Sequence, residues 1–358
     1  MSAEVDQMFS VRQVPWHLGT ETTEDQVKVL AEYPGREEAM RLAGHDFTVA
    51  EEPTYRRITR MVETEDGPVE QVSFIEVKGH KFLVNDKSTE NDKVLHVASD
   101  SYTVVQPGVL YDLTEAILDQ DEDVKWETGG TLSGGEVLWT LAKVDRPFFI
   151  TKDPSPIFPY VVASTTNNGT GGVKVANIQM RIVCRNTFNA ADYESANSGR
   201  EFTFRHTRFV NQRIEEAKAI LAGATKQAQA FAELGEELVK VSYTDRAIEA
   251  FIQEFIPNPE QAGQVVSDRV RENVEEARTL VRSLFDSPTI SPDIRNTGYG
   301  AMQVGIEYLQ YLRKGKWGRS LNTTTYLNRT LLKPERLSDR LVPMIRRIGD
   351  ENPVSVLA

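Results

Sequence analysis

The chain has 358 residues, of which 40% are apolar, and a formal net charge of −12 at pH 7. This length suffices for one large core with a helical extension or for two modest domains. No stretch approaches the roughly 18–20 uncharged apolar residues of a membrane span, and the first residues lack the basic-then-apolar order of a signal peptide, so we expect a cytoplasmic protein.

Strand patterns dominate the first half of the chain. β-branched and aromatic residues alternate with polar ones in short segments that are separated by polar or glycine-rich turns, such as residues 65–68 and 166–172. The segments with this pattern are 47–62, 69–77, 80–85, 135–144, 160–165 and 173–184. Residues 101–107 predict a further short strand ahead of a helix, in which Leu110, Leu113 and Ile117 lie at helical spacing.

Helical periodicity replaces the strand patterns after residue 207. Apolar residues recur every three or four positions across 211–240, which predicts one long amphipathic helix or two nearly collinear ones. Further helices are expected at 245–255, 268–285, 298–313 and 335–348. We therefore predict an α+β fold: a mixed, mainly antiparallel sheet core with a long helix, followed by a helical C-terminal region. The predicted division is 1–210 for the core and 211–358 for the helical region.

Charge is distributed unevenly along the chain. Residues 1–173 carry 15 basic and 30 acidic side chains, a net charge of −15. Residues 174–230 carry 9 basic and 5 acidic side chains (+4), and residues 295–347 carry 11 and 3 (+8). Two basic islands thus lie in an acidic protein, and they are either binding surfaces for a polyanion or solvated charge without a ligand.

The first island combines arginines with aromatic residues. In an extended strand Arg181 and Arg185 share one face, and if residues 202–209 are also extended, Phe204, His206 and Arg208 share another. Such surfaces suit a single nucleic-acid strand, because its phosphates pair with the cations and its bases stack on the rings. The predicted nucleic-acid-binding residues, two of them from the second island, are Lys174, Arg181, Arg185, Asn186, Phe204, Arg205, His206, Arg208, Arg213, Lys316 and Arg319.

Each of these assignments has a structural alternative. Arg181 and Arg185 would otherwise pair with acidic residues of the N-terminal half, and His206 would be a hydrogen-bonded core histidine. In the second island Tyr308 and Tyr311 lie at helical spacing, so they would otherwise pack in a core.

Signals of catalysis or metal binding are absent from the sequence. The five histidines are scattered without the spacing that brings two imidazoles together, and the single cysteine, Cys184, lies in an apolar run that predicts a buried, inert thiol. The glycine-rich segments 129–135 and 169–172 match neither a phosphate-binding loop nor a dinucleotide-binding motif. We expect a protein that is not an enzyme and holds no metal or cofactor.

Several motifs occur in a recognisable order: PWHLGT (15–20), SYTVVQP (101–107), ETGGTLSGGEVLW (127–139), RIVCRNTFNAA (181–191) and FRHT (204–207). Together they resemble the phage/plasmid-like family that carries a bacterial domain of unknown function, with RIVCRNT as the most specific element. This chain departs from the family pattern at two places. The family usually has a Gly before the Leu-Gly of the first motif. It also usually has His-Asp-Gly where this chain has Asn167, Asn168 and Gly169, so the His-Asp pair that would suggest catalysis is missing.

The resemblance implies an origin in a mobile element of a bacterial cell. The order of strands, helix, strands and long helix is also similar to that of phage single-strand annealing proteins, by fold analogy only. We therefore expect a non-enzymatic, homo-oligomeric DNA-binding protein of phage or plasmid replication or recombination, with single-stranded DNA as its ligand. The alternative is a phage regulator or inhibitor that binds a host protein through its acidic surface, and a hydrolase or nucleotide-acting enzyme is a third.

Overall fold

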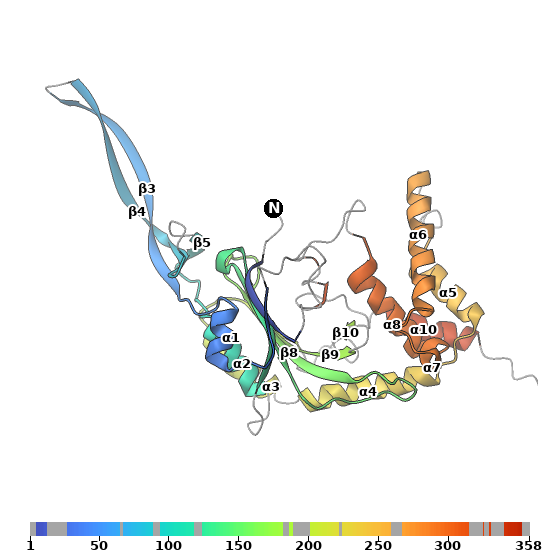
Figure 1. Ribbon diagram of the computed structural model, residues 1–358. Helices are drawn as coiled ribbons and strands as arrows, with labels where there is room; N and C mark the ends of the chain where they lie inside the picture. The colour runs from blue at the N-terminus through green and yellow to red at the C-terminus, as the bar shows by residue number, and fades with distance from the viewer. Residues whose placement is uncertain are drawn as a thin grey trace, which may run out of the picture.

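The computed structural model contains a sheet lobe, a helical lobe beside it and a long hairpin that projects from the sheet lobe (Figure 1). The residues that it describes are 5–12, 27–64, 67–88, 94–117, 124–181, 186–188, 201–221, 224–258, 267–314, 325, 329–330 and 340–352. This arrangement confirms the predicted α+β fold with a helical C-terminal region.

The sheet lobe is built on a mixed sheet in the order β10-β9-β8-β7-β6-β1-β2, with β11 also paired to β9. Only β1 and β2 run parallel to each other, so the sheet is mainly antiparallel, as predicted. The bounds are β1 (Val5–Val11), β2 (Val27–Leu30), β6 (Lys125–Leu132), β7 (Val137–Lys143), β8 (Ile157–Thr166), β9 (Val173–Arg181), β10 (Asn186–Phe188) and β11 (Glu201–Phe204).

Three helices pack on one face of this sheet: α1 (Arg36–Leu42), α2 (Gly108–Ile117) and α3 (Val210–Leu221). Their apolar side chains bury Trp126 and Leu138 together with Tyr111 of α2. The predicted strand at 101–107 is wrong: the segment is irregular and leads into α2, with Val105 buried in the same core. The opposite face carries a second apolar cluster around Trp139 and Tyr160.

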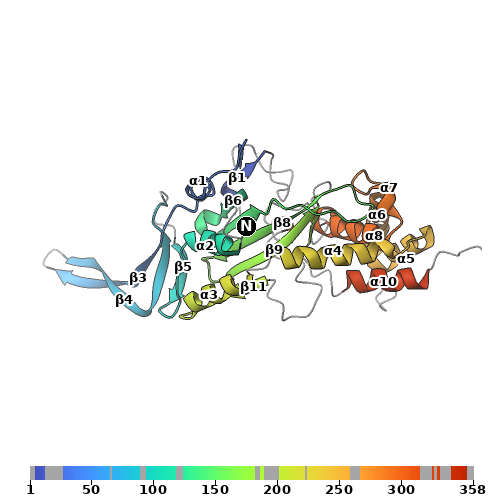
Figure 2. The same cartoon turned by 90° about the horizontal axis from the view of Figure 1, so that it is seen from below.

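The helical lobe has its own core, around Phe251, Phe285 and Ile345. Its helices are α4 (Ala224–Lys240), α5 (Asp245–Phe255), α6 (Asp268–Phe285), α7 (Pro292–Arg295), α8 (Gly298–Glu307), a π-helical turn (Tyr308–Leu312) and α10 (Leu341–Glu351). α5 and α6 lie where they were predicted, and the segment 211–240 forms two helices, α3 and α4, which is one of the two predicted arrangements. Figure 2 shows α4 extending from the sheet lobe towards α5 and α10.

Close packing in this lobe depends on glycine. A Cβ at Gly300 of α8 would lie only 2.2 Å from the carbonyl oxygen of Ile294, so no larger residue fits there. α8 is consequently buried on nearly all sides. Among the described residues no helix is both long and apolar enough to cross a membrane.

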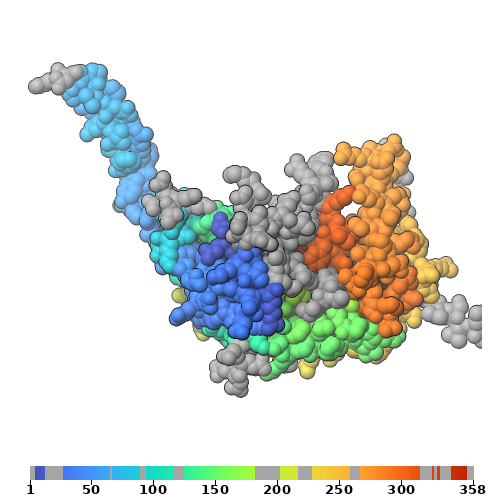
Figure 3. Space-filling view, in the orientation of Figure 1, coloured from blue at the N-terminus to red at the C-terminus, as the bar shows by residue number. Residues whose placement is uncertain are grey.

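The projecting hairpin consists of β3 (Val49–Thr64) and β4 (Gly67–Asn85), and a short third strand, β5 (Val94–Ser99), pairs with the base of β4. The sequence predicted separate strands at 69–77 and 80–85, but the structure joins them into one strand across an irregularity in the register. Gly79 lies at this irregularity with a φ of +88°, a backbone conformation that is strained for residues with a side chain. The distal part of the hairpin stands clear of both lobes (Figure 3).

Candidate nucleic-acid interface

Arg181, the predicted phosphate contact on β9, is buried. Its side chain is 3% exposed, and its Nε and Nη2 donate to the two carboxylate oxygens of Asp153 at 2.6 and 2.7 Å. Its Nη1 donates to the carbonyl of Thr289 at 2.7 Å. The prediction that Arg181 contacts DNA is therefore wrong, and the alternative of a paired arginine is confirmed.

The cause is that β9 is an interior strand. It pairs with β8 on one side and with β10 and β11 on the other, and all of its residues except Lys174 are buried. Both faces of β9 are covered, so Asn177, Gln179 and Arg181 are enclosed, and the face expected to be cationic does not meet solvent in the described part of the strand. Lys174 itself is half-buried.

Phe204 and His206 are also in the interior, so the prediction that they stack on bases is wrong. Phe204 is 7% exposed and packs in the sheet-lobe core, with its ring 5.6 Å from that of Phe202. The Nδ1 of His206 donates to the carbonyl of Thr103 at 3.3 Å, and its Nε2 lies 3.2 Å from the Oγ1 of Thr165. Its ring stacks on Tyr102 at 4.8 Å. Burial lowers the pKa of His206, which favours a neutral core histidine.

Four of the singled-out residues lie outside the described residues: Arg185, Lys316, Arg319 and Cys184. Asn186 belongs to β10, but its side chain is also outside the description. The structure therefore places neither the thiol nor the two predicted contacts of the second island. Tyr308 of that island is buried in the helical-lobe core, and Tyr311 packs against the cluster around Trp139, so the alternative of packed tyrosines is confirmed.

The structure does bring the remaining cations together, where β11 ends and α3 begins. β11 stops at Phe204 and the chain turns, so Arg205, Arg208 and Arg213 are all exposed. Phe209, in the same turn, is 53% exposed, and the Arg208 guanidinium lies 4.8 Å from the centre of its ring. We call these four residues the β11–α3 surface.

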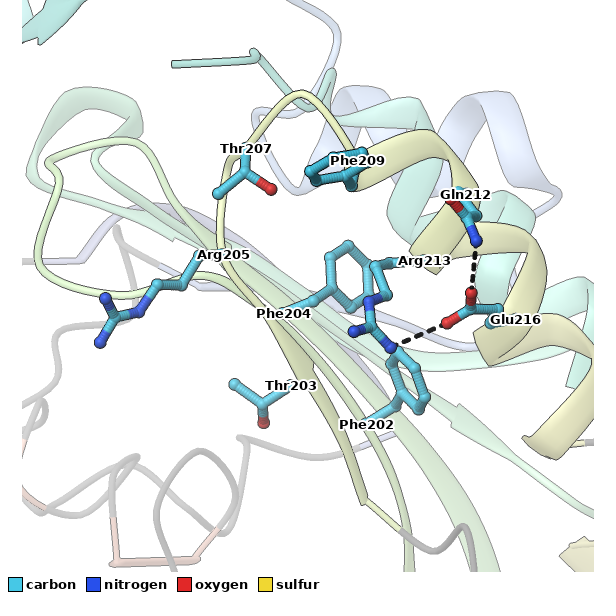
Figure 4. Close-up of a pocket in the computed structure, with 9 residues that line it drawn as sticks. All are labelled: Phe202, Thr203, Phe204, Arg205, Thr207, Phe209, Gln212, Arg213 and Glu216. Carbon is cyan, nitrogen blue, oxygen red and sulfur yellow. Dashed lines mark hydrogen bonds and ion pairs between the residues drawn. The ribbon is translucent and has the colours of Figure 1, made fainter. Parts of the chain in front are cut away.

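A hollow of about 660 Å³ lies in this surface, and side chains from both elements line it (Figure 4). Arg213 donates to a carboxylate oxygen of Glu216 at 2.9 Å, and Gln212 donates to the other oxygen at 2.9 Å. In Figure 4 Arg205 points away from this pair, towards the other side of β11. Within the described part of the chain, no carboxylate pairs with Arg205 or Arg208.

The start of α3 adds to the positive potential of this surface. The first four backbone N–H groups of a helix lack partners within the helix, and the helix dipole places partial positive charge there. α3 is 12 residues long and has no acidic residue in its first turn, and the carboxylate of Glu216, which lies further along the helix, is paired with Arg213. The arrangement can bind anionic groups and stack a planar ring, and it contains no nucleophile paired with a base among its lining residues.

Comparison with protein families assigns most of the chain. Residues 94–333, two thirds of the 358, match a domain of unknown function, DUF932. The chain belongs to the DUF932 family. No curated protein and no solved structure matches it. The β11–α3 surface lies inside the DUF932 region, whereas β3 and β4 of the hairpin precede it.

Two features of this DUF932 protein were missed by the sequence reasoning. A single strand over 202–209 predicts that Phe204 is exposed, but β11 ends at Phe204, and after the turn Phe209 is the exposed ring while Phe204 is buried. The second is a cluster around Glu127 of β6, which neighbours Tyr33, Lys143 and Arg12. Burial raises the pKa of Glu127, and burial together with Glu127 raises the pKa of Tyr33 to about 12. Among the described residues no group of His, Cys, Asp and Glu is placed to hold a metal ion.

Proposed function

We propose that this DUF932 protein binds single-stranded DNA through the β11–α3 surface and catalyses no reaction. The observation that carries the proposal is the exposed Arg208–Phe209 pair, flanked by Arg205 and Arg213. An exposed ring with a cation on its face presents a stacking platform next to a phosphate contact, which is the combination that single-strand binding proteins use. The electropositive start of α3 supports the same ligand.

Arg213 acts differently from the other two arginines in this proposal. Both side chains of its ion pair with Glu216 are exposed to solvent, so the pair stabilises the protein by at most about 1 kcal/mol. A phosphate therefore competes with the carboxylate for the guanidinium. Arg205 and Arg208 need give up no such pair among the described residues. They are therefore the stronger phosphate contacts.

The biological setting of the proposal comes from the sequence resemblance. A role in phage or plasmid replication or recombination, in the cytoplasm of a bacterial host, accords with the phage/plasmid-like motifs. Single-strand annealing fits a protein that assembles into homo-oligomers, because several copies then line their cationic surfaces along one strand.

The first test is an Arg205→Gln/Arg208→Gln double variant. Each lost phosphate contact lowers the slope of log binding constant against log salt by about 0.7, so we expect the slope to fall by about 1.4 and binding to weaken for all sequences alike. The measurement is fluorescence anisotropy of a labelled oligonucleotide over a range of salt concentrations. Arg269→Gln/Arg271→Gln is the matched control, because both arginines are exposed on α6 and distant from the surface.

A second variant, Phe209→Leu, separates stacking from charge. Loss of one base–ring stack costs about 1–3 kcal/mol, which is roughly a 5- to 150-fold weaker affinity, with the salt slope unchanged. Phe209 is half exposed, so the fold should keep its stability. If the double variant and Phe209→Leu both bind like the wild type, with the same salt slope, DNA contacts another surface or none.

A further inference from the structure

The distal part of the hairpin, which we call the arm, comprises residues 54–64 of β3 and 67–77 of β4. β5 pairs only with residues 80–84 of β4, so along the arm the described residues offer no third strand on either side. Each outer edge thus presents backbone N–H and C=O groups for pairing with another strand. The arm lies before the DUF932 region, so this inference is independent of the proposed DNA binding.

Apolar side chains are exposed on both faces of the arm. Paired residues share a face, so Phe74 lies on one side with Met61 and Tyr55, while Ile75 and Val69 lie on the other. Phe74 is 67% exposed and Met61 is 65% exposed. An isolated two-stranded hairpin is marginally stable in water, and one with this much exposed apolar surface is suited to being covered by a partner.

The charges of the arm identify that partner. The half nearest the sheet lobe carries Arg56, Arg57 and Arg60 on β3, with Glu76 as the only acid in residues 54–60 and 71–77. The described part of the distal half, residues 61–64 and 67–70, contains no basic residue and carries Glu63 and Glu70. The half of the arm nearest the sheet lobe is thus positive, and the described part of the distal half is negative. A nucleic acid would be repelled by Glu63 and Glu70. A second arm in the opposite direction instead matches these acids, because they share a face with Arg57, which then lies opposite the acids of its partner.

We propose that the arm binds the arm of a second copy of this chain, in antiparallel orientation. The basic half of each arm then lies against the acidic distal half of the other, and exposed side chains such as Phe74 and Met61 are covered. Backbone pairing along the outer edges gives the contact its direction, and the charges fix its register.

Reciprocal charge reversal tests the proposal. One variant is Glu63→Arg/Glu70→Arg, which reverses the described acids of the distal half on β3 and β4, and the other is Arg57→Glu/Arg60→Glu. Each variant alone should self-associate roughly tenfold or more weakly than the wild type, because like charges then face each other. An equimolar mixture of the two should recover the wild-type association, since reversed charges on one chain meet their complements on the other.

Recovery on mixing is the decisive readout. Arg57 and Glu70 also form an exposed ion pair within one arm, at 3.8 Å, and both variants lose it. Neither chain regains that internal pair in the mixture, so recovery reports contact between arms only. Sedimentation velocity at low ionic strength measures the association, and circular dichroism checks the fold. Asp268→Arg/Arg271→Glu on α6 is the control and should associate like the wild type.

Three outcomes would overturn the proposal. They are a wild-type protein that is monomeric at every concentration, variants that associate like the wild type, and a mixture that fails to recover. If Arg57→Glu/Arg60→Glu weakens DNA binding without changing the mass in solution, the arm contacts nucleic acid instead and the proposal is wrong.

Discussion

Replacing Arg181 with Gln is expected to lower the free energy of unfolding by about 3–5 kcal/mol, because the change leaves the carboxylate of Asp153 buried without its cation. Asp153 is 0% exposed, and its oxygens also accept from Tyr299 Oη at 3.1 Å and from the Ser155 backbone N–H at 3.1 Å. Those bonds remain but do not neutralise the charge.

Urea denaturation measures this change in the free energy of unfolding, and two further variants serve as comparisons. Arg181→Met/Asp153→Leu removes both charges and should be more stable than Arg181→Gln alone, because no ion is left unpaired. Arg208→Gln, at an exposed arginine, should shift the free energy of unfolding by no more than about 0.5 kcal/mol. An Arg181→Gln protein with wild-type stability and weaker DNA binding would reverse our assignment of Arg181 to the interior.

Acidification is expected to destabilise the protein through His45, which follows α1 and is fully buried between Tyr111 of α2 and Gly130 of β6. Its Nε2 donates to the carbonyl of Gly130 at 2.9 Å, and its Nδ1 lies 3.0 Å from the hydroxyl of Tyr111, which donates to it. Burial lowers the pKa of His45 from its ordinary value of 6.5 to about 4. The imidazole therefore stays neutral in the folded protein until the pH approaches that value.

The unfolded chain takes up this proton below about pH 6.5, whereas the folded chain does not, so stability falls with pH from about 6.5 to about 4. The difference of about 2.5 pH units corresponds to about 3 kcal/mol at the acid end of that range. His206 has a lowered pKa for the same reason and acts in the same direction.

Urea midpoints between about pH 7 and pH 4.5 measure the effect of His45, with a His45→Gln variant for comparison. The variant should be less stable at neutral pH, because it disturbs a buried hydrogen-bond pair. Its stability should nevertheless depend less on pH than that of the wild type. Equal pH dependence in the two proteins would show that His45 does not resist protonation.

The amino-acid pattern predicts the helices of this protein better than its binding surface. α5 and α6 lie where the sequence predicts them, because their apolar period and the residues that begin them are local properties. The burial of Arg181 depends on residues that are distant in the sequence. Its partners, Asp153 and Thr289, are 28 and 108 residues away in the chain. A strand pattern alone does not reveal whether its second face meets water or another element.

The remaining discrepancies have the same origin. Exposure of Phe209 instead of Phe204 depends on β11 ending after four residues, and the end of a strand is set by its neighbours as much as by its own residues. The strands of the arm were predicted, but their apolar residues gave no sign that they project from the protein, because apolar residues usually indicate a core.

The Arg181–Asp153 pair also affects whether the two lobes unfold separately or together. Arg181 ends a strand of the sheet, Thr289 lies between α6 and α7, and Tyr299 belongs to α8, so one buried charge network includes residues of both lobes. Unfolding of the helical lobe alone would remove two partners of this network and open the ion pair to water while the sheet remained folded. That penalty couples the lobes, so we expect a single cooperative transition and no stable sheet-lobe fragment after limited proteolysis.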